Sequence, residues 1–235
     1  MLKSHASAWA SDAPTPAQIK EFFAQVESGK VTKARFQKFL RGVSEKDYGE
    51  TLLDWQRFYN KYFFNQDKDF SGLRIPERRE GFNRLIVVAE GMTSGRIFVR
   101  MNERMPAWKY WQNLDVIISD RKADHDYAIW VRDREEADEE LKNKSANGLK
   151  KEGISGITLE ERLLYELKFF EETCKHLDMD NVTLCAGSRD PDGGVPSVHW
   201  LSDEVDVDWH GAGVDVGWYS PDYRGDRIRA RAAVS

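Results

Sequence analysis

A valine-x-tryptophan unit occurs three times in the last third of the chain, and this repeat constrains the fold more than any other feature. The copies are Val198-His199-Trp200, Val207-Asp208-Trp209 and Val216-Gly217-Trp218. Side chains alternate between the two faces of a β-strand, so the valine and tryptophan of each copy would share one face. The repeat therefore predicts strands with one apolar face toward a core and one polar face toward solvent.

The outward face of these strands has an unusual composition. From Ser188 to Asp226 the chain offers Asp, Gly, Ser, His and Tyr, contains no lysine, and has glutamate only at Glu204. Asp and Gly are poor strand formers, and such a departure from local preference is typical of functional surfaces. The mixture also resembles an antibody binding surface, where Tyr supplies rigid contact area and small polar residues supply adaptable contacts. A solvated β-meander with acidic turns is the alternative interpretation.

Composition excludes several classes of function. The 235 residues carry a net charge of -5, which argues against a sequence-independent grip on nucleic acid. Cys174 and Cys185 are predicted on a helix and on a strand, which indicates buried reduced thiols and no disulfide framework. No apolar stretch approaches the ~18 residues of a membrane span, and residues 1–14 lack the apolar centre of a secretory signal. We therefore expect a cytoplasmic protein without a membrane partner.

Helical patterns fill the first 65 residues. Thr15-Pro16 predicts a capped first helix, a second helix begins at Thr32, and a third follows over about 52–62. Apolar and aromatic residues at helical spacing favour packed cores over a cofactor site or a groove for a partner. They are Ile19, Phe22, Phe23, Val26, Phe36, Phe39, Leu40, Val43, Leu52, Trp55, Phe58, Tyr59 and Tyr62.

A polar, charged stretch from Gln66 to Glu80 predicts a linker. The expected organisation is a helical N-terminal module with its linker over residues 1–75, and a second domain over residues 76–235. Helix and strand patterns are mixed along this second domain, which predicts the α+β class. Its expected strands are 84–88, 127–132, 182–185 and 227–231, beside the valine-tryptophan strands.

Three helices are expected in the second domain. One lies over 93–103, and a second over 132–140, where alternating charges predict a solvated helix face and not a site for acid-base or metal chemistry. The third opens with the capping box Thr158-Leu159-Glu160-Glu161 and carries one apolar stripe. The stripe consists of Leu159, Leu163, Leu167, Phe170, Cys174 and Leu177.

The order of capped helix, strand, Gly187-Ser188 pair, tryptophan-bearing strands and closing strand carries a family resemblance. It covers Leu85 to Ser235 through the segments DYAIWVRDREEADEELKN, GITLEERLLYELKFFEETCKHLD, TLCAGSR and RARAAVS. This stretch resembles uncharacterised proteins of candidate-phylum bacteria. Those proteins are similar to variable proteins of diversity-generating retroelements, which have a C-type-lectin-like fold related to the formylglycine-generating enzyme type. Here Ala186-Gly187-Ser188-Arg189 replaces the Gly-Gly-Ser-Trp of that class, and Ile228-Arg229 its closing Gly-Phe-Arg.

The resemblance implies a binding protein with a fixed scaffold and a diversified surface over about 188–226. In that class a reverse transcriptase rewrites adenines near the end of the gene, which yields codons for Asp, Tyr, His, Ser or Gly. The implied ligand-binding residues are Ser197, His199, Asp206, Asp208, His210, Asp215, Gly217, Tyr219, Ser220, Asp222, Tyr223, Gly225 and Asp226. The implied scaffold is Val198, Trp200, Val207, Trp209, Val216, Trp218 and Ile228. The expected ligand is a macromolecule, a protein above all, and no catalysis, cofactor or metal is expected.

Two other functions stay open at this point. A calcium-dependent lectin could draw oxygen ligands from acidic residues, although the Glu-Pro-Asn type of sugar motif is absent. These residues are Asp190, Asp192, Asp203, Glu204, Asp206 and Asp208. A formylglycine-generating type of enzyme would need a cysteine pair, which Cys174 and Cys185 do not resemble. His199, His210 and Asp208 could also hold a transition metal, but histidines on such a surface are more often unliganded.

Overall fold

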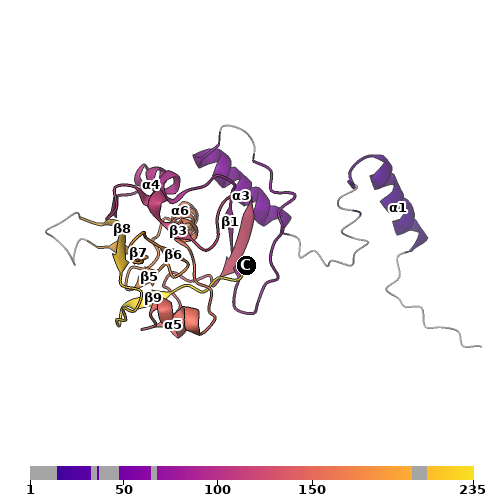
Figure 1. The fold of residues 1–235 in the computed structure, drawn as a ribbon. Coiled ribbons are helices and arrows are strands. Elements are labelled where there is room, and N and C mark those ends of the chain that lie inside the picture. Colours follow the sequence, from indigo (N-terminus) through magenta and orange to yellow (C-terminus); the bar gives the residue numbers. More distant parts are fainter. Residues whose placement is uncertain (1–14, 33–35, 37–47, 65–67, 203–210) are drawn as a thin grey trace, which may run out of the picture. The chain divides into compact units, whose positions relative to one another are not determined.

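The structure is a computed structural model that describes residues 15–32, 36, 48–64, 68–202 and 211–235 (Figure 1). The chain forms two compact units, Met1–Tyr48 and Gly49–Ser235. In the first unit, helix α1 (Pro16–Glu27) follows the predicted cap Thr15, which also forms a capping box with Gln18. None of its residues is buried, and Phe23 is 58% exposed. The core packing expected for this helix is therefore wrong, and most of the second expected helix lies outside the described residues.

Helix α3 (Gly49–Tyr62) is the expected third helix, but it belongs to the second unit. It packs along β1 (Arg84–Val88) through buried aromatic side chains. The indole Nε1 of Trp55 donates to the carbonyl of Leu85 at 3.2 Å, and the Tyr59 hydroxyl donates to the carbonyl of Val87 at 2.8 Å. The second unit therefore begins at Gly49 and not at residue 76, because a boundary at 76 would part this helix from its strand.

The described residues of the second unit form three sheets. β1 pairs antiparallel with β4 (Tyr127–Val131), and β3 (Ile118–Ser119) pairs antiparallel with β6 (Ser188–Arg189). The third is a mixed five-stranded sheet in the order β2-β8-β7-β5-β9. Its strands are β2 (Ala107–Lys109), β5 (Val182–Leu184), β7 (Val195–Leu201), β8 (Gly213–Tyr219) and β9 (Ile228–Ala230). The α+β class and the strands expected outside the repeat are confirmed.

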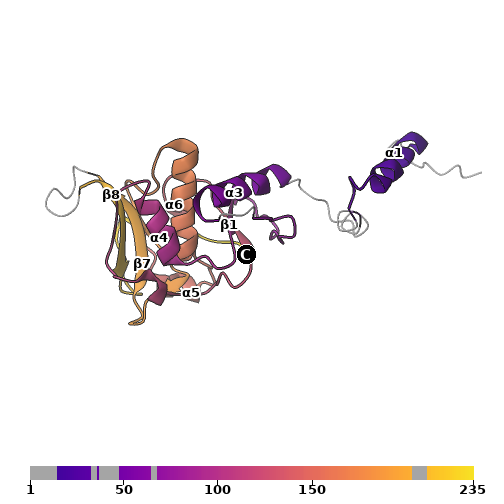
Figure 2. The ribbon, with the colours of Figure 1, turned by 90° about the horizontal axis from the view of Figure 1, so that it is seen from above.

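Two helices lie side by side against the five-stranded sheet, as Figure 2 shows. They are α4 (Ser94–Asn102) and α6 (Leu159–Thr173). Thr158 forms the predicted capping box, because its hydroxyl accepts from the Glu161 N–H at 3.3 Å and the Glu161 carboxylate accepts from the Thr158 N–H at 2.8 Å. On the other face, Ala146 of α5 (Ala146–Lys151) packs against Val182, Leu184, Val195 and Ile228.

Helix α6 is also buried outside its apolar stripe, where its Arg162 belongs to a cluster of buried charged residues. Asp178 accepts from Arg162 at 2.8 Å, from Arg231 at 2.7 Å and from the Thr183 hydroxyl. Burial alone would raise the pKa of Asp178, but the two guanidinium groups hold it below its ordinary value. Arg231, near the C-terminus, is thus part of this buried charged cluster. Removal of one partner would leave an uncompensated buried charge.

Residues 132–140 do not form the expected helix. The segment is irregular, with a bend at Glu135 and Glu136, up to the 3₁₀ turn η2 (Glu139–Leu141). Another 3₁₀ turn, η1 (Leu114–Val116), follows β2. Asp138 is buried, and its carboxylate accepts from Arg132 at 2.6 Å and from the Ala232 N–H at 2.8 Å. The backbone N–H of Asp138 donates to the carbonyl of Ala230 at 3.0 Å. The segment lies along the C-terminal strand, so tertiary contacts replace the helical hydrogen bonds that its charge pattern predicts.

The two cysteines differ in environment. Cys185 is buried, as predicted, and burial raises the pKa of its thiol. Cys174 ends α6 in the left-handed conformation with a φ of 56° and is exposed. Its expected burial is wrong, because the helix itself stops at Thr173 and Cys174, as the capping residue, no longer follows the helical spacing of the apolar stripe.

Candidate functional site

The predicted binding residues of the third repeat meet those of the first across the β7–β8 pair. In the antiparallel register, His199 lies opposite Asp215, Ser197 opposite Gly217, and Val195 opposite Tyr219. We call Ser197, His199, Asp215, Gly217 and Tyr219 the β7–β8 polar face. Residues that lie opposite one another on neighbouring strands point to the same side, so this face brings together five positions that the sequence predicts for binding.

Exposure changes along the β7–β8 polar face. Ser197 is only 2% exposed, because Leu184 of β5 lies next to it in the sheet and the cluster around α5 covers that end. Tyr219 also packs against this cluster. The side chains of His199 and Asp215 are 14% and 29% exposed. The expected outward position of Ser197 is therefore wrong, and the accessible end is the one with His199 and Asp215.

His199 has an unusual electrostatic environment. Its Nδ1 atom is buried without a hydrogen-bond partner among the described residues and lies 3.9 Å from the Asp215 carboxylate. Burial lowers the pKa of His199 to about 4, with Arg227 acting in the same direction and Asp178 against it. The imidazole is therefore neutral at neutral pH, when it has one nitrogen that accepts and one that donates.

A structured turn continues the β7–β8 polar face beyond β8. The rings of Tyr219 and Tyr223 stack with centroids 4.6 Å apart and planes 14° apart. Asn147 of α5 donates to the Asp222 carboxylate at 2.9 Å, and its N–H donates to the carbonyl of Pro221 at 3.0 Å. The exposed residues of this turn that the sequence predicts for binding are Ser220, Asp222, Tyr223 and Asp226, and Gly225 is half-buried.

Asp206, Asp208 and His210, which are also predicted to bind ligand, lie outside the described residues. The same is true of Val207 and Trp209 from the predicted scaffold. The second repeat is therefore not placed on either face.

The burial predicted for the scaffold is found for its described aliphatic residues but not for its two described tryptophans. Val198, Val216 and Ile228 are buried. Trp200 is half-buried and stacks on His176 with centroids 3.4 Å apart. Trp218 is 46% exposed, so its expected burial is wrong.

Trp218 takes part in an exposed aromatic group that the sequence reasoning missed. Strand β2 pairs with β8 only up to Val216, so Trp218 lies past the end of this edge strand. Its ring centroid is 6.1 Å from that of Tyr110, which is 69% exposed and contacts Trp111 at 5.5 Å. The dense aromatic run at 108–111 in a polar surrounding was the available sequence signal.

Among the described residues, no group of three or more His, Cys, Asp or Glu side chains is arranged to hold a metal ion. Asp190 instead serves its own turn, since its carboxylate accepts from the N–H groups of Asp192 at 3.0 Å and Gly194 at 2.7 Å. In the part of the chain that the structure describes, no helix is long and apolar enough to span a bilayer.

Comparison of the chain with protein-family models, curated proteins and solved structures finds no match.

Proposed function

We propose that this chain is a non-catalytic, cytoplasmic binding protein whose surface over about 188–226 is diversified by a retroelement and recognises a protein ligand. The observation that carries the proposal is the β7–β8 polar face and its continuation into the 220–226 turn. Residues from separate parts of the sequence gather there over buried Val198 and Val216. Tyrosines beside small polar residues provide the contacts that dominate interface energy.

We also propose that the second unit has a C-type-lectin-like fold. The order of elements supports this proposal: the capped helix α6 leads to β5, the Gly187-Ser188 pair, β7 and β8, and then the closing strand β9. This is the order on which the sequence resemblance rests. Within the proposed surface, buried Ser197 acts as scaffold, whereas exposed Trp218 is available for contact.

The two alternative functions gain no support from the described residues. Burial raises the pKa of the Cys185 thiol and so disfavours the reactive thiolate, while Cys174 is exposed at the end of α6. The Asp190 carboxylate is engaged within its own turn, where a calcium site would need its oxygens.

The gene tests the retroelement part of the proposal. We expect a nearby reverse transcriptase gene and an adenine-rich near-copy of the codons for Ser188 to Asp226. Copies of the gene that differ mainly outside these codons would contradict diversification of this surface.

Two matched libraries test the binding part. A library randomised at Asp215, Ser220, Asp222 and Tyr223 should stay largely folded and yield binders to unrelated protein targets, because these side chains reach solvent. A control library at Val198, Val216, Leu184 and Ile228, all buried, should mostly misfold. Equal loss of folded protein in both libraries would overturn the proposed surface.

A further inference from the structure

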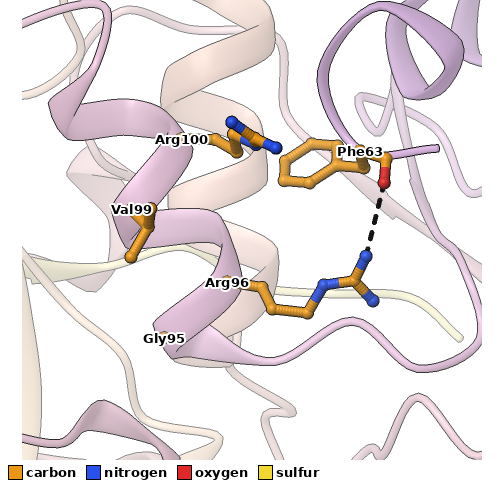
Figure 3. Close-up of a pocket in the computed structure, with 5 residues that line it drawn as sticks. All are labelled: Phe63, Gly95, Arg96, Val99 and Arg100. Carbon is orange, nitrogen blue, oxygen red and sulfur yellow. Dashed lines mark hydrogen bonds between the residues drawn. The ribbon is translucent and has the colours of Figure 1, made fainter. Parts of the chain in front are cut away.

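A solvent-open pocket of about 320 Å³ lies between α4 and the residue that follows α3 (Figure 3). Its lining consists of Phe63, Gly95, Arg96, Val99 and Arg100. None of these residues belongs to the β7–β8 polar face or to the 220–226 turn. The volume falls at the lower end of the ~300–1,000 Å³ that is usual for small-ligand sites.

Arg96 is held in the pocket by backbone carbonyls. Its guanidinium donates to the carbonyl of Gly91 at 2.9 Å and to that of Phe63 at 3.4 Å, the bond drawn in Figure 3. The same group lies over the Phe64 ring, 5.6 Å from its centroid. Carbonyls and a ring position the guanidinium without neutralising its charge. Because a guanidinium has more N–H donors than these two bonds use, donors remain for a ligand.

Arg100 lies one helical turn after Arg96, so both side chains leave α4 on the same side. Its guanidinium donates to both oxygens of Glu103, at 2.9 Å and 3.0 Å. The two side chains of that ion pair are 45% and 52% exposed, so the pair is weak and exchanges readily with another anion.

Among the described residues, the rest of the lining is apolar and includes no carboxylate. Figure 3 shows Phe63 beyond the end of α3 and Arg96 and Arg100 on α4, all of which line the pocket. Val99 is 58% exposed and adds an aliphatic wall. Asp115 lies close by, but its carboxylate already accepts from the Gly95 N–H at 2.8 Å at the start of the helix.

We infer that this pocket binds a small organic anion, that is, a phosphate or carboxylate group attached to an apolar body. Arginine recognises the planar carboxylate and the tetrahedral phosphate group through paired N–H donors, and two guanidinium groups one helical turn apart provide such donors here. The phenyl ring and Val99 then contact the apolar body.

Calorimetric titration of the full-length protein with phenyl phosphate, benzoate and inorganic phosphate tests this inference. We expect phenyl phosphate or benzoate to bind with a Kd below about 10 mM, and inorganic phosphate to bind several-fold more weakly because it lacks the apolar body. The stronger of the two organic ligands identifies the anionic group. Absence of binding by both would overturn the inference.

Four variants separate the pocket from general charge effects. Arg96→Gln and Arg100→Gln should each weaken binding about tenfold, a loss typical of one charged hydrogen-bond partner. Glu103→Gln should tighten binding, because it releases Arg100 from its ion pair. Arg79→Gln, which removes an exposed charge outside the lining, should leave the Kd unchanged. Equal weakening by Arg79→Gln and Arg96→Gln, or weaker binding by Glu103→Gln, would overturn the site; unchanged thermal melts confirm that each variant is folded.

Discussion

At the scale of single residues, exposure depends on what covers a strand and not on alternation alone. Val216 and Trp218 share one side of β8, yet Val216 is fully buried and Trp218 is 46% exposed. Ser197 shows the opposite case, because it lies on the polar side of β7 and is nevertheless buried. The alternation of residue types predicted which side chains point together, whereas the ends of β2 and the position of α5 decide which of them reach solvent.

Trp218→Ala should change the free energy of unfolding by less than about 1 kcal/mol, because half of this side chain is already in water. Leu184→Ala in the neighbouring part of the sheet should cost roughly 2 to 5 kcal/mol through lost burial and a cavity. Denaturant melts of both variants measure the difference. A larger loss for Trp218→Ala than for Leu184→Ala would contradict the exposed position of Trp218.

His199 should make stability depend on pH. Its folded pKa of about 4 lies below the ordinary value of 6.5, so the unfolded chain takes up a proton first as the pH falls. The contribution of His199 to the free energy of unfolding is fully present above pH 6.5. It is lost as the pH falls from 6.5 through about 4, and the loss amounts to at most about 3 kcal/mol. Denaturant melts across this window should show a smaller loss for His199→Gln than for the unchanged protein. Identical pH profiles would contradict the buried neutral imidazole.

At the scale of elements, the starts of two helices were predictable from their capping residues, whereas the structure of one charged segment was not. Thr15 and Thr158 both begin helices with capping boxes, since this motif is complete within four consecutive residues. The run over 132–140 also has a helical pattern, but Asp138 bonds to Ala232, far away in the sequence. A local pattern cannot contain such a partner, so the irregular course of this segment could not be predicted from the sequence.

Thr158→Ala should destabilise the second unit by about 1 to 2 kcal/mol, because the Glu161 N–H would lose its acceptor at the buried start of α6. Thr15→Ala removes the same kind of cap from α1, where no residue is buried. Its effect on the melting of the second unit should be zero within error. Calorimetric melts compare the two variants, and equal shifts would contradict the division of the chain into two units.

At the scale of the whole molecule, the sequence predicted most helices and strands but placed the domain boundary too late. The polar stretch before residue 80 looks like a linker, although Phe70 within it is buried. Helix α3 joins the second unit through bonds from Trp55 and Tyr59 to carbonyls of β1. The amphipathic spacing of the aromatic residues in α3 predicted a packed helix face, but no nearby sequence feature identified the strand against which that face packs. The candidate site was predicted in part for the same reason, because residue types were visible and the covering elements were not.

A fragment of residues 49–235 should therefore melt at the same temperature as the second unit of the full chain. A fragment of residues 76–235 should lose at least several kcal/mol of stability or fail to fold. It lacks Trp55, Phe58 and Tyr59, and full burial of one such side chain is worth roughly 1.5 to 3 kcal/mol. Circular dichroism melts of the two fragments make the comparison. Equal stability would restore the boundary at residue 76.

The bonds from α3 to β1 also bear on self-association. A strand at the border of a sheet presents free carbonyl and N–H groups that recruit strands from other molecules. In β1 the Leu85 and Val87 carbonyls are taken by Trp55 and Tyr59, and the N–H of Ala89, just after the strand, donates to the Tyr59 hydroxyl at 3.0 Å. Aromatic side chains of a helix thus occupy positions that a foreign strand would use, so α3 covers this edge of β1 against the addition of a strand from another molecule.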